Sequence, residues 1–202
     1  MKIGSGQTDD VNDGKFTLTF KRCSSLEAIS LPADLECKFL QFNCFECDAL
    51  SYFTPSPRCH NLDLGFYCCT GLSEVKWPPE RKYNNVKLFF SDCKRVRIFE
   101  LPAGCNISQD IFLIFDKCGI EEVVLPPDLK CKSIGLSLLR CGMESFKLTT
   151  TAKITLKIFS CASLKNLTLP ADNNRIAGHE SIIGWPGMPE GFKLPGGWRK
   201  DA

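Results

Sequence analysis

Apolar and polar residues alternate in short stretches that recur along most of the chain. Each stretch leads to a cysteine and carries apolar residues five and three positions before it. These cysteines, called the ladder cysteines below, are Cys23, Cys47, Cys69, Cys93, Cys118, Cys141 and Cys161. The apolar pairs are Leu18/Phe20, Phe42/Cys44, Leu64/Phe66, Leu88/Phe90, Leu113/Phe115, Leu136/Leu138 and Leu156/Ile158. Alternation with a period of two predicts a β-strand with one buried face, and this pattern repeats in seven units of about 23 residues.

A second apolar set follows each ladder cysteine. In the first unit, "CSSLEAISLP", it consists of Leu26, Ile29 and Leu31 and ends at Pro32. Proline cannot donate a backbone hydrogen bond to a neighbouring strand, so it ends the segment. The sixth unit, "CGMESFKLTT", lacks this proline, and the second, "CDALSYFTPSP", is irregular. Each unit therefore predicts a strand, a tight corner at the cysteine, a second extended segment and another corner.

A single unit of this size cannot fold alone. About five large inward side chains contribute roughly 10 kcal/mol. Ordering the backbone of such a unit costs roughly 25–45 kcal/mol. Stacking with parallel strands paired from coil to coil closes the gap. The sequence thus predicts a mainly β, right-handed solenoid of about seven coils with little helix.

The block "CxxLxxIxLPxxL", as in "CSSLEAISLPADL" and "CASLKNLTLPAD", resembles the leucine-rich repeat of the bacterial BspA-like surface proteins. The resemblance covers about residues 15–170. The second half of each unit departs from the family pattern, because strand-like segments such as "NVKLFFSDC" replace it. The resemblance implies a leucine-rich repeat solenoid that sits at a bacterial surface or is secreted, and that takes part in adhesion or host contact.

The chain contains 13 cysteines, an odd number, in a domain too large to depend on disulfides. A cysteine at the corner after a strand lies inside the coil, where its thiol packs as a small apolar group and donates weakly to a carbonyl. A second row follows at Cys37, Cys59, Cys105 and Cys131. Side chains on adjacent coils point the same way, which fits a disulfide poorly. We expect mostly free, buried and unreactive thiols.

Two kinds of site chemistry remain as alternatives to a binding scaffold. The motif "CFEC" with the cysteines downstream offers a zinc or redox set of Cys44, Cys47, Cys59 and Cys68. Nucleophilic catalysis finds little support, because the only histidines are His60, beside Cys59, and His179 in "GHES". No phosphate-binding loop, GxSxG or HExxH motif occurs. We therefore expect no enzyme activity, no cofactor, no metal and no catalytic residues.

The outward positions of the strands before the cysteines are unusually apolar. Exposed apolar area of this kind commonly marks an interaction site. The sequence therefore predicts a binding surface, either for a protein partner or for self-association, unless these side chains are covered or the alternation is out of phase by one residue. The candidate binding residues are Phe45, Tyr67, Phe89, Ile114, Leu139 and Phe159.

Charge and the chain ends complete the division into regions. The net charge of +2 gives no reason to expect nucleic acid as a partner, and no apolar stretch is long enough for a membrane span. Residues 1–14 are polar and are expected to form a flexible tether, and residues 15–170 the solenoid. Residues 171–202 break the repeat and are expected to form an irregular cap, with Trp185, Phe192 and Trp198 covering the last coil.

The function predicted from these features is a non-enzymatic protein-binding scaffold, at the cell surface or secreted. An intracellular adaptor or effector on the same scaffold stays open as an alternative, because "MKIGSGQTDD" carries no export signal. Either the chain is cytoplasmic or such a signal has been removed.

Overall fold

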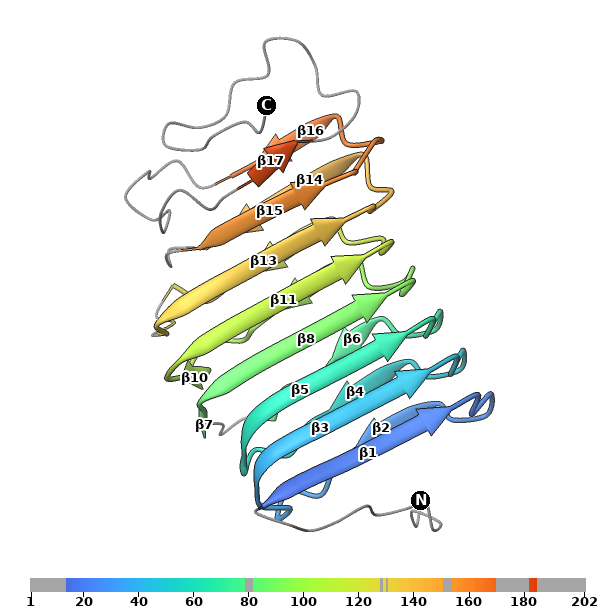
Figure 1. Cartoon of the computed structure of the whole chain (residues 1–202), viewed down its shortest axis with the longest axis vertical. Coiled ribbons are helices and arrows are strands. Elements are labelled where there is room, and N and C mark those ends of the chain that lie inside the picture. The colour runs from blue at the N-terminus through green and yellow to red at the C-terminus, as the bar shows by residue number, and fades with distance from the viewer. Residues whose placement is uncertain are drawn as a thin grey trace.

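The chain winds into a stack of flattened coils, with long strands on one side and short strands on the other (Figure 1). The computed structural model describes residues 14–78, 82–127, 129, 131–150, 154–169 and 182–184. Every strand pair in it is parallel. The predicted mainly β solenoid of stacked parallel strands is confirmed, and no helix occurs in the described residues.

The front sheet, nearest the viewer in Figure 1, has eight strands in the order β1-β3-β5-β8-β11-β13-β15-β17. Each of its first seven strands is the segment that leads to a ladder cysteine. Their bounds are β1 Lys15–Lys21, β3 Cys37–Phe45, β5 Cys59–Tyr67, β8 Asn85–Ser91, β11 Asp110–Asp116, β13 Ser133–Leu139 and β15 Thr155–Phe159. The eighth strand, β17, is Ile182–Gly184 and pairs with β15.

The opposite side of the stack is divided. One three-stranded sheet contains β2 Ala28–Ser30, β4 Tyr52–Thr54 and β6 Glu74–Val75. A four-stranded sheet contains β9 Ile98–Glu100, β12 Glu122–Val124, β14 Ser145–Thr149 and β16 Asn166–Thr168. Together they are called the back sheets. A small pair, β7 Lys82–Tyr83 and β10 Asn106–Ile107, joins two coils along one side.

The core lies between the front and back sheets and follows the alternation in the sequence. Leu64 and Phe66 in β5, for example, are fully buried, whereas Tyr67 is partly exposed. Phenylalanine rings run from coil to coil, with centroid separations of 5.4 Å for Phe66–Phe90 and 5.1 Å for Phe90–Phe115. Each such ring contributes about 1.5–3 kcal/mol by burial, and neighbouring rings add about 0.5–1.5 kcal/mol per pair.

The corner after each front strand has a conformation that the sequence did not reveal. The residue before every ladder cysteine has a positive φ of 51–55°, although none of these residues is glycine. This left-handed conformation strains a side-chain-bearing residue. It also turns the backbone N–H toward the next coil: Glu46 N donates to Tyr67 O at 2.9 Å, and Cys68 N donates to Ser91 O at 2.8 Å. The seven corner residues are Arg22, Glu46, Cys68, Asp92, Lys117, Arg140 and Ser160.

Two predicted regions lie largely outside the described residues. The tether over residues 1–14 is described only at Gly14. Within residues 171–202, only β17 is described, so the cap residues Trp185, Phe192 and Trp198, together with His179, fall outside the described part.

Candidate binding surface

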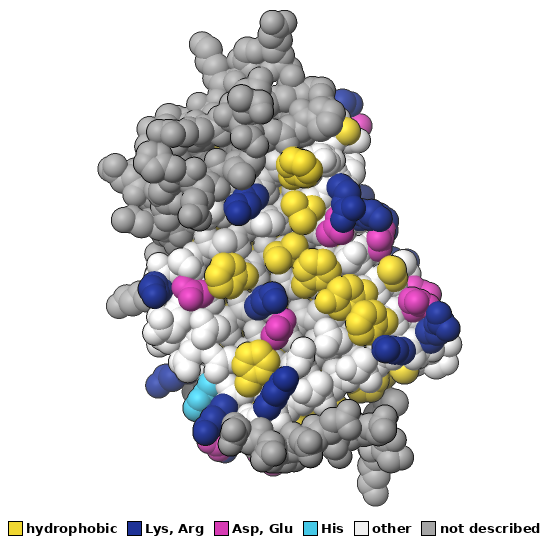
Figure 2. Space-filling model, in the orientation of Figure 1, with side chains coloured by type: hydrophobic (Ala, Val, Ile, Leu, Met, Phe, Trp, Pro, Cys, Tyr) yellow, Lys and Arg dark blue, Asp and Glu magenta, His cyan; other side chains and the backbone are white. Residues whose placement is uncertain are grey.

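The six candidate residues lie on the outer face of the front sheet, one on each of six consecutive strands, β3 to β15 without β1. They are called the apolar band: Phe45, Tyr67, Phe89, Ile114, Leu139 and Phe159. Phe159 is 58% exposed and the other five are partly exposed. Figure 2 shows hydrophobic side chains gathered in a diagonal band across this face, with charged side chains on both sides.

Aromatic rings form the first half of the band. The rings of Phe45 and Tyr67 stack with centroids 4.6 Å apart and planes within 8°, and Phe89 lies 5.2 Å from Tyr67. Gly65 makes room for this arrangement, because a Cβ there would lie 2.6 Å from Cε2 of Tyr67. At the start of the band, Lys21 Nζ lies 5.5 Å from the Phe45 ring centroid. The faces of these rings are therefore partly covered by contacts within the band.

The second half of the band bends around a charged pair. Phe89 and Ile114 lie opposite each other in β8 and β11, and Leu139 and Phe159 lie opposite each other in β13 and β15. Between these two pairs, Asp116 takes the position that Leu139 occupies in the next coil. Its carboxylate accepts two hydrogen bonds from the guanidinium of Arg140, at 2.9 and 2.6 Å. This face thus combines apolar side chains with ion pairs, of which Asp116–Arg140 is joined by two hydrogen bonds.

One exposed apolar residue on this face was not among the predicted residues. Phe112 in β11 is 45% exposed, and its ring lies over Gly135, where an added Cβ would be 3.0 Å from Cδ1 of Phe112. The sequence contained the signal, because Phe112 is two residues before Ile114 in the alternating strand. Phe112, Ile114, Ser137, Thr155 and Lys157 line a groove of about 370 Å³ around Gly135.

The ladder cysteines lie at the inner side of the corners and bind backbone carbonyls. Cys93 Sγ donates to Phe66 O at 3.5 Å, and Cys141 Sγ donates to Phe115 O at 3.4 Å, each in the preceding coil. Contact with the Cys118 thiol, followed by burial, raises the pKa of Cys93. A buried, protonated thiol is a poor nucleophile. The thiol of Cys93 is therefore a structural group of the stack and not a reactive one.

The expectation that adjacent coils fit a disulfide poorly is wrong for one pair. Cys37 and Cys59 form a disulfide, with their Cα atoms 4.6 Å apart. The two residues are directly opposite in the parallel pair β3–β5, and both are buried. Their Cα separation lies within the range of about 4.4–6.8 Å that disulfides require. Rotation of both side chains toward each other, which the spacing argument neglected, is sufficient.

The proposed zinc or redox set is not brought together. Cys59 is bonded to Cys37, and in residues 14–78, where all four members lie, no three ligand-type side chains gather around one point. Cys68 is exposed at a corner between Glu46 and Asp92, and burial together with these carboxylates raises its pKa. His60 is exposed on β5, beside the disulfide-bonded Cys59.

Stacked coils with parallel front strands and a cysteine at each corner are the features of a leucine-rich repeat solenoid. A family described as the BspA type leucine rich repeat region matches residues 17–113 and 113–180, in six copies. The chain belongs to this BspA-type leucine-rich repeat family. Comparisons with curated proteins and with solved structures find no match. No helix in the described residues has the length and hydropathy needed to cross a membrane.

Proposed function

We propose that this protein is a non-enzymatic scaffold that binds another protein through the apolar band on its front sheet. The main support for this proposal is the contiguous run of exposed or partly exposed apolar side chains over six adjacent strands. The family fold, which serves protein–protein interaction, supports it as well. Contiguous apolar area is unusual on a soluble monomer and commonly marks an interface. The ion pair Asp116–Arg140 supplies a directional polar contact beside it.

We also propose that the protein works outside the cytoplasm, at a bacterial surface or in secreted form, in adhesion or host contact. The Cys37–Cys59 disulfide favours this location over that of an intracellular adaptor, because disulfides persist in oxidising compartments. Mass spectrometry of the protein isolated from its native source with thiols blocked tests this. Recovery of the Cys37–Cys59 peptide pair supports export, whereas two alkylated cysteines contradict it.

A double substitution tests the band without disturbing the core. Phe89→Asp with Phe159→Asp places two carboxylates on the band, and unfolding stability should fall by no more than about 1–1.5 kcal/mol, since neither side chain is buried. Partner recovery in a quantitative pull-down should fall at least about tenfold. A stability loss of several kcal/mol would show that these residues belong to the core.

Val124→Asp on β12 is the control, since Val124 is also partly exposed but lies on the back of the stack. It should leave partner recovery unchanged. Undiminished partner recovery with the double variant, or a loss only with Val124→Asp, contradicts the band proposal. Sedimentation of the wild type and the double variant identifies a second copy of the chain as the occupant if only the wild type dimerises.

A further inference from the structure

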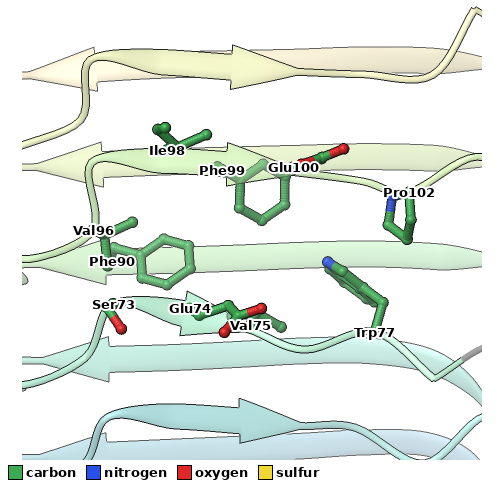
Figure 3. A pocket seen from close by; sticks show the side chains of 10 residues that line it. All are labelled: Ser73, Glu74, Val75, Trp77, Phe90, Val96, Ile98, Phe99, Glu100 and Pro102. Atoms are coloured by element: carbon green, nitrogen blue, oxygen red, sulfur yellow. The ribbon is translucent and has the colours of Figure 1, made fainter.

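The back of the stack is interrupted between β6 and β9. These strands belong to consecutive coils, yet β6 pairs only with β4, and β9 pairs only with β12. A cleft of about 360 Å³ lies between them (Figure 3). Its apolar lining consists of Val75, Trp77, Phe90, Val96, Ile98, Phe99 and Pro102. A cleft of this size falls in the range of small binding sites, about 300–1,000 Å³.

The interruption coincides with an exception in the sequence repeat. Trp77 lies eight residues after its ladder cysteine. Five other coils have a buried leucine at the equivalent position, which is seven residues after the cysteine in the two shortened coils. These leucines are Leu31, Leu101, Leu125, Leu148 and Leu169. An indole does not fit the space of an isobutyl group without displacing its neighbours. Its ring packs edge-on against Phe99, with centroids 6.4 Å apart.

The misfit leaves hydrogen-bonding groups unused at the cleft. Leu101 N donates to Val124 O of the next coil at 3.1 Å, and Leu125 N donates to Thr149 O at 2.8 Å. Trp77 makes no corresponding backbone bond to a described residue. Its indole Nε1 is also buried without an acceptor among the described residues, and it points into the cleft toward β9 (Figure 3). Buried donors are nearly always paired, so this one indicates an absent acceptor.

Two carboxylates stand at the mouth of the cleft. Glu74 lies on β6 and Glu100 on β9, and both are exposed. Lys76 Nζ is 3.9 Å from Glu74 and 3.7 Å from the centroid of the Tyr52 ring, so it is shared between them. Glu100 forms no ion pair with a described residue. The mouth therefore favours a cation.

We propose that the cleft binds an extended segment of a partner polypeptide that carries an arginine or lysine. The aliphatic part of that side chain packs over Trp77 and Pro102, which are the partly exposed part of the apolar lining, and its charged end meets Glu100 and Glu74. A peptide carbonyl accepts the indole N–H of Trp77. The edges of β6 and β9 can separate to admit the segment without breaking a backbone hydrogen bond between them, because none joins them. This site is independent of the apolar band.

Titration of the ¹⁵N-labelled protein with acetyl-Gly-Val-Arg-Val-Gly-amide tests the proposal. The indole N–H resonance of Trp77, assigned by its loss in Trp77→Phe, should shift saturably, and binding should weaken with salt. The same peptide with norleucine in place of arginine should bind about tenfold more weakly. No saturable shift at millimolar peptide, or equal binding of the norleucine peptide, overturns the proposal.

Three variants make the result specific to the cleft. Glu100→Gln should reduce affinity about three- to tenfold, whereas Glu27→Gln, at an exposed glutamate of the first coil, should leave it unchanged. Trp77→Leu, which installs the residue of the other coils, should fold and lose peptide binding. Undiminished binding by folded Trp77→Leu, or equal losses in Glu100→Gln and Glu27→Gln, contradicts the proposal. If the double variant Phe89→Asp with Phe159→Asp still binds this peptide, the cleft binds independently of the apolar band, and the two proposals can be judged separately.

Discussion

The front and back of the stack are built by the same repeat but differ in continuity. The front sheet runs through eight strands without a break, and its first seven strands have five to nine residues each. The back strands have two to five residues and separate into two sheets between β6 and β9. Longer strands exchange more hydrogen bonds per coil, so the front tolerates variation in side-chain size that the back does not.

The front sheet keeps its pairing where the back sheets separate. β6 and β9 do not pair at the coil that carries Trp77 in a leucine slot, yet β5 and β8 of the same two coils stay paired over seven residues. A local misfit is thus confined to one side. A surface feature such as the cleft can arise there without loss of the fold.

The largest expected effect comes from truncating equivalent aromatic residues on the two sides. Phe66→Ala in the front sheet should lower the free energy of unfolding by about 3–5 kcal/mol, because Phe66 is fully buried among other rings. Phe99→Ala at the cleft should cost about 1–2 kcal/mol less, since open space already adjoins it. Urea denaturation of both variants measures this. Equal losses would show that the cleft is closed in solution.

Two glycines, each directly after a ladder cysteine, allow a comparison of a crowded corner with an open one. A Cβ on Gly119 would lie 2.5 Å from the carbonyl oxygen of Lys94, whereas one on Gly142 would meet nothing within 4 Å. Gly119→Ala should therefore destabilise the protein by about 1–3 kcal/mol. Gly142→Ala should be neutral or stabilising by about 0.4–1 kcal/mol. Thermal unfolding of both variants measures this difference. Equal unfolding midpoints would contradict the close approach of Gly119 to the Lys94 carbonyl.

The ladder thiols at the corners after the front strands should make the unfolding free energy depend on pH. Contact with Cys118 and burial raise the pKa of Cys93 in the folded state, above the unfolded value of about 8.5. The stabilisation that the protonated Cys93 thiol gives the folded state is fully present below pH 8.5. Above that pH it is lost at about 1.4 kcal/mol per pH unit. The double variant Cys93→Ala with Cys118→Ala should therefore show a shallower fall in stability between about pH 8.5 and 9.5; both thiols are replaced because the contact with Cys93 lowers the pKa of Cys118. An unchanged slope in anaerobic urea titrations would contradict this assignment.

The smallest effect should come from repairing the break itself. Trp77→Leu should allow β6 and β9 to pair, and each backbone hydrogen bond gained is worth about 0.5–1.5 kcal/mol. Loss of indole packing offsets part of this gain, so we expect a net stabilisation below about 1 kcal/mol. Hydrogen exchange at Val75 and at the substituted position should slow down. Faster exchange there would mean that the tryptophan holds the two back sheets together.

The periodic features of this fold could be predicted from the sequence, and the irregular ones could not. Inward alternation and cysteine corners appear in every coil, so the stack followed from counting positions. The Cys37–Cys59 disulfide escaped because it depends on side-chain rotation between coils. The left-handed corners escaped because residues such as Arg22 and Lys117 have no preference for that conformation; the bond to the next coil imposes it. The sequence shows Trp77 at a position where other coils have leucine. The missing strand pairing beside it appears only in the structure.

The corner residues carry a consequence for how such proteins diversify. Their backbone shape is dictated by neighbours, and their side chains point away from the core, so the seven positions hold six different residue types, five of them polar or charged and one cysteine. Arg22 meets Glu46 at 2.8 Å along this row. A lineage could rewrite the sequence of charges along this rim, one coil at a time, and so alter what the rim repels or attracts while the architecture beneath is inherited intact.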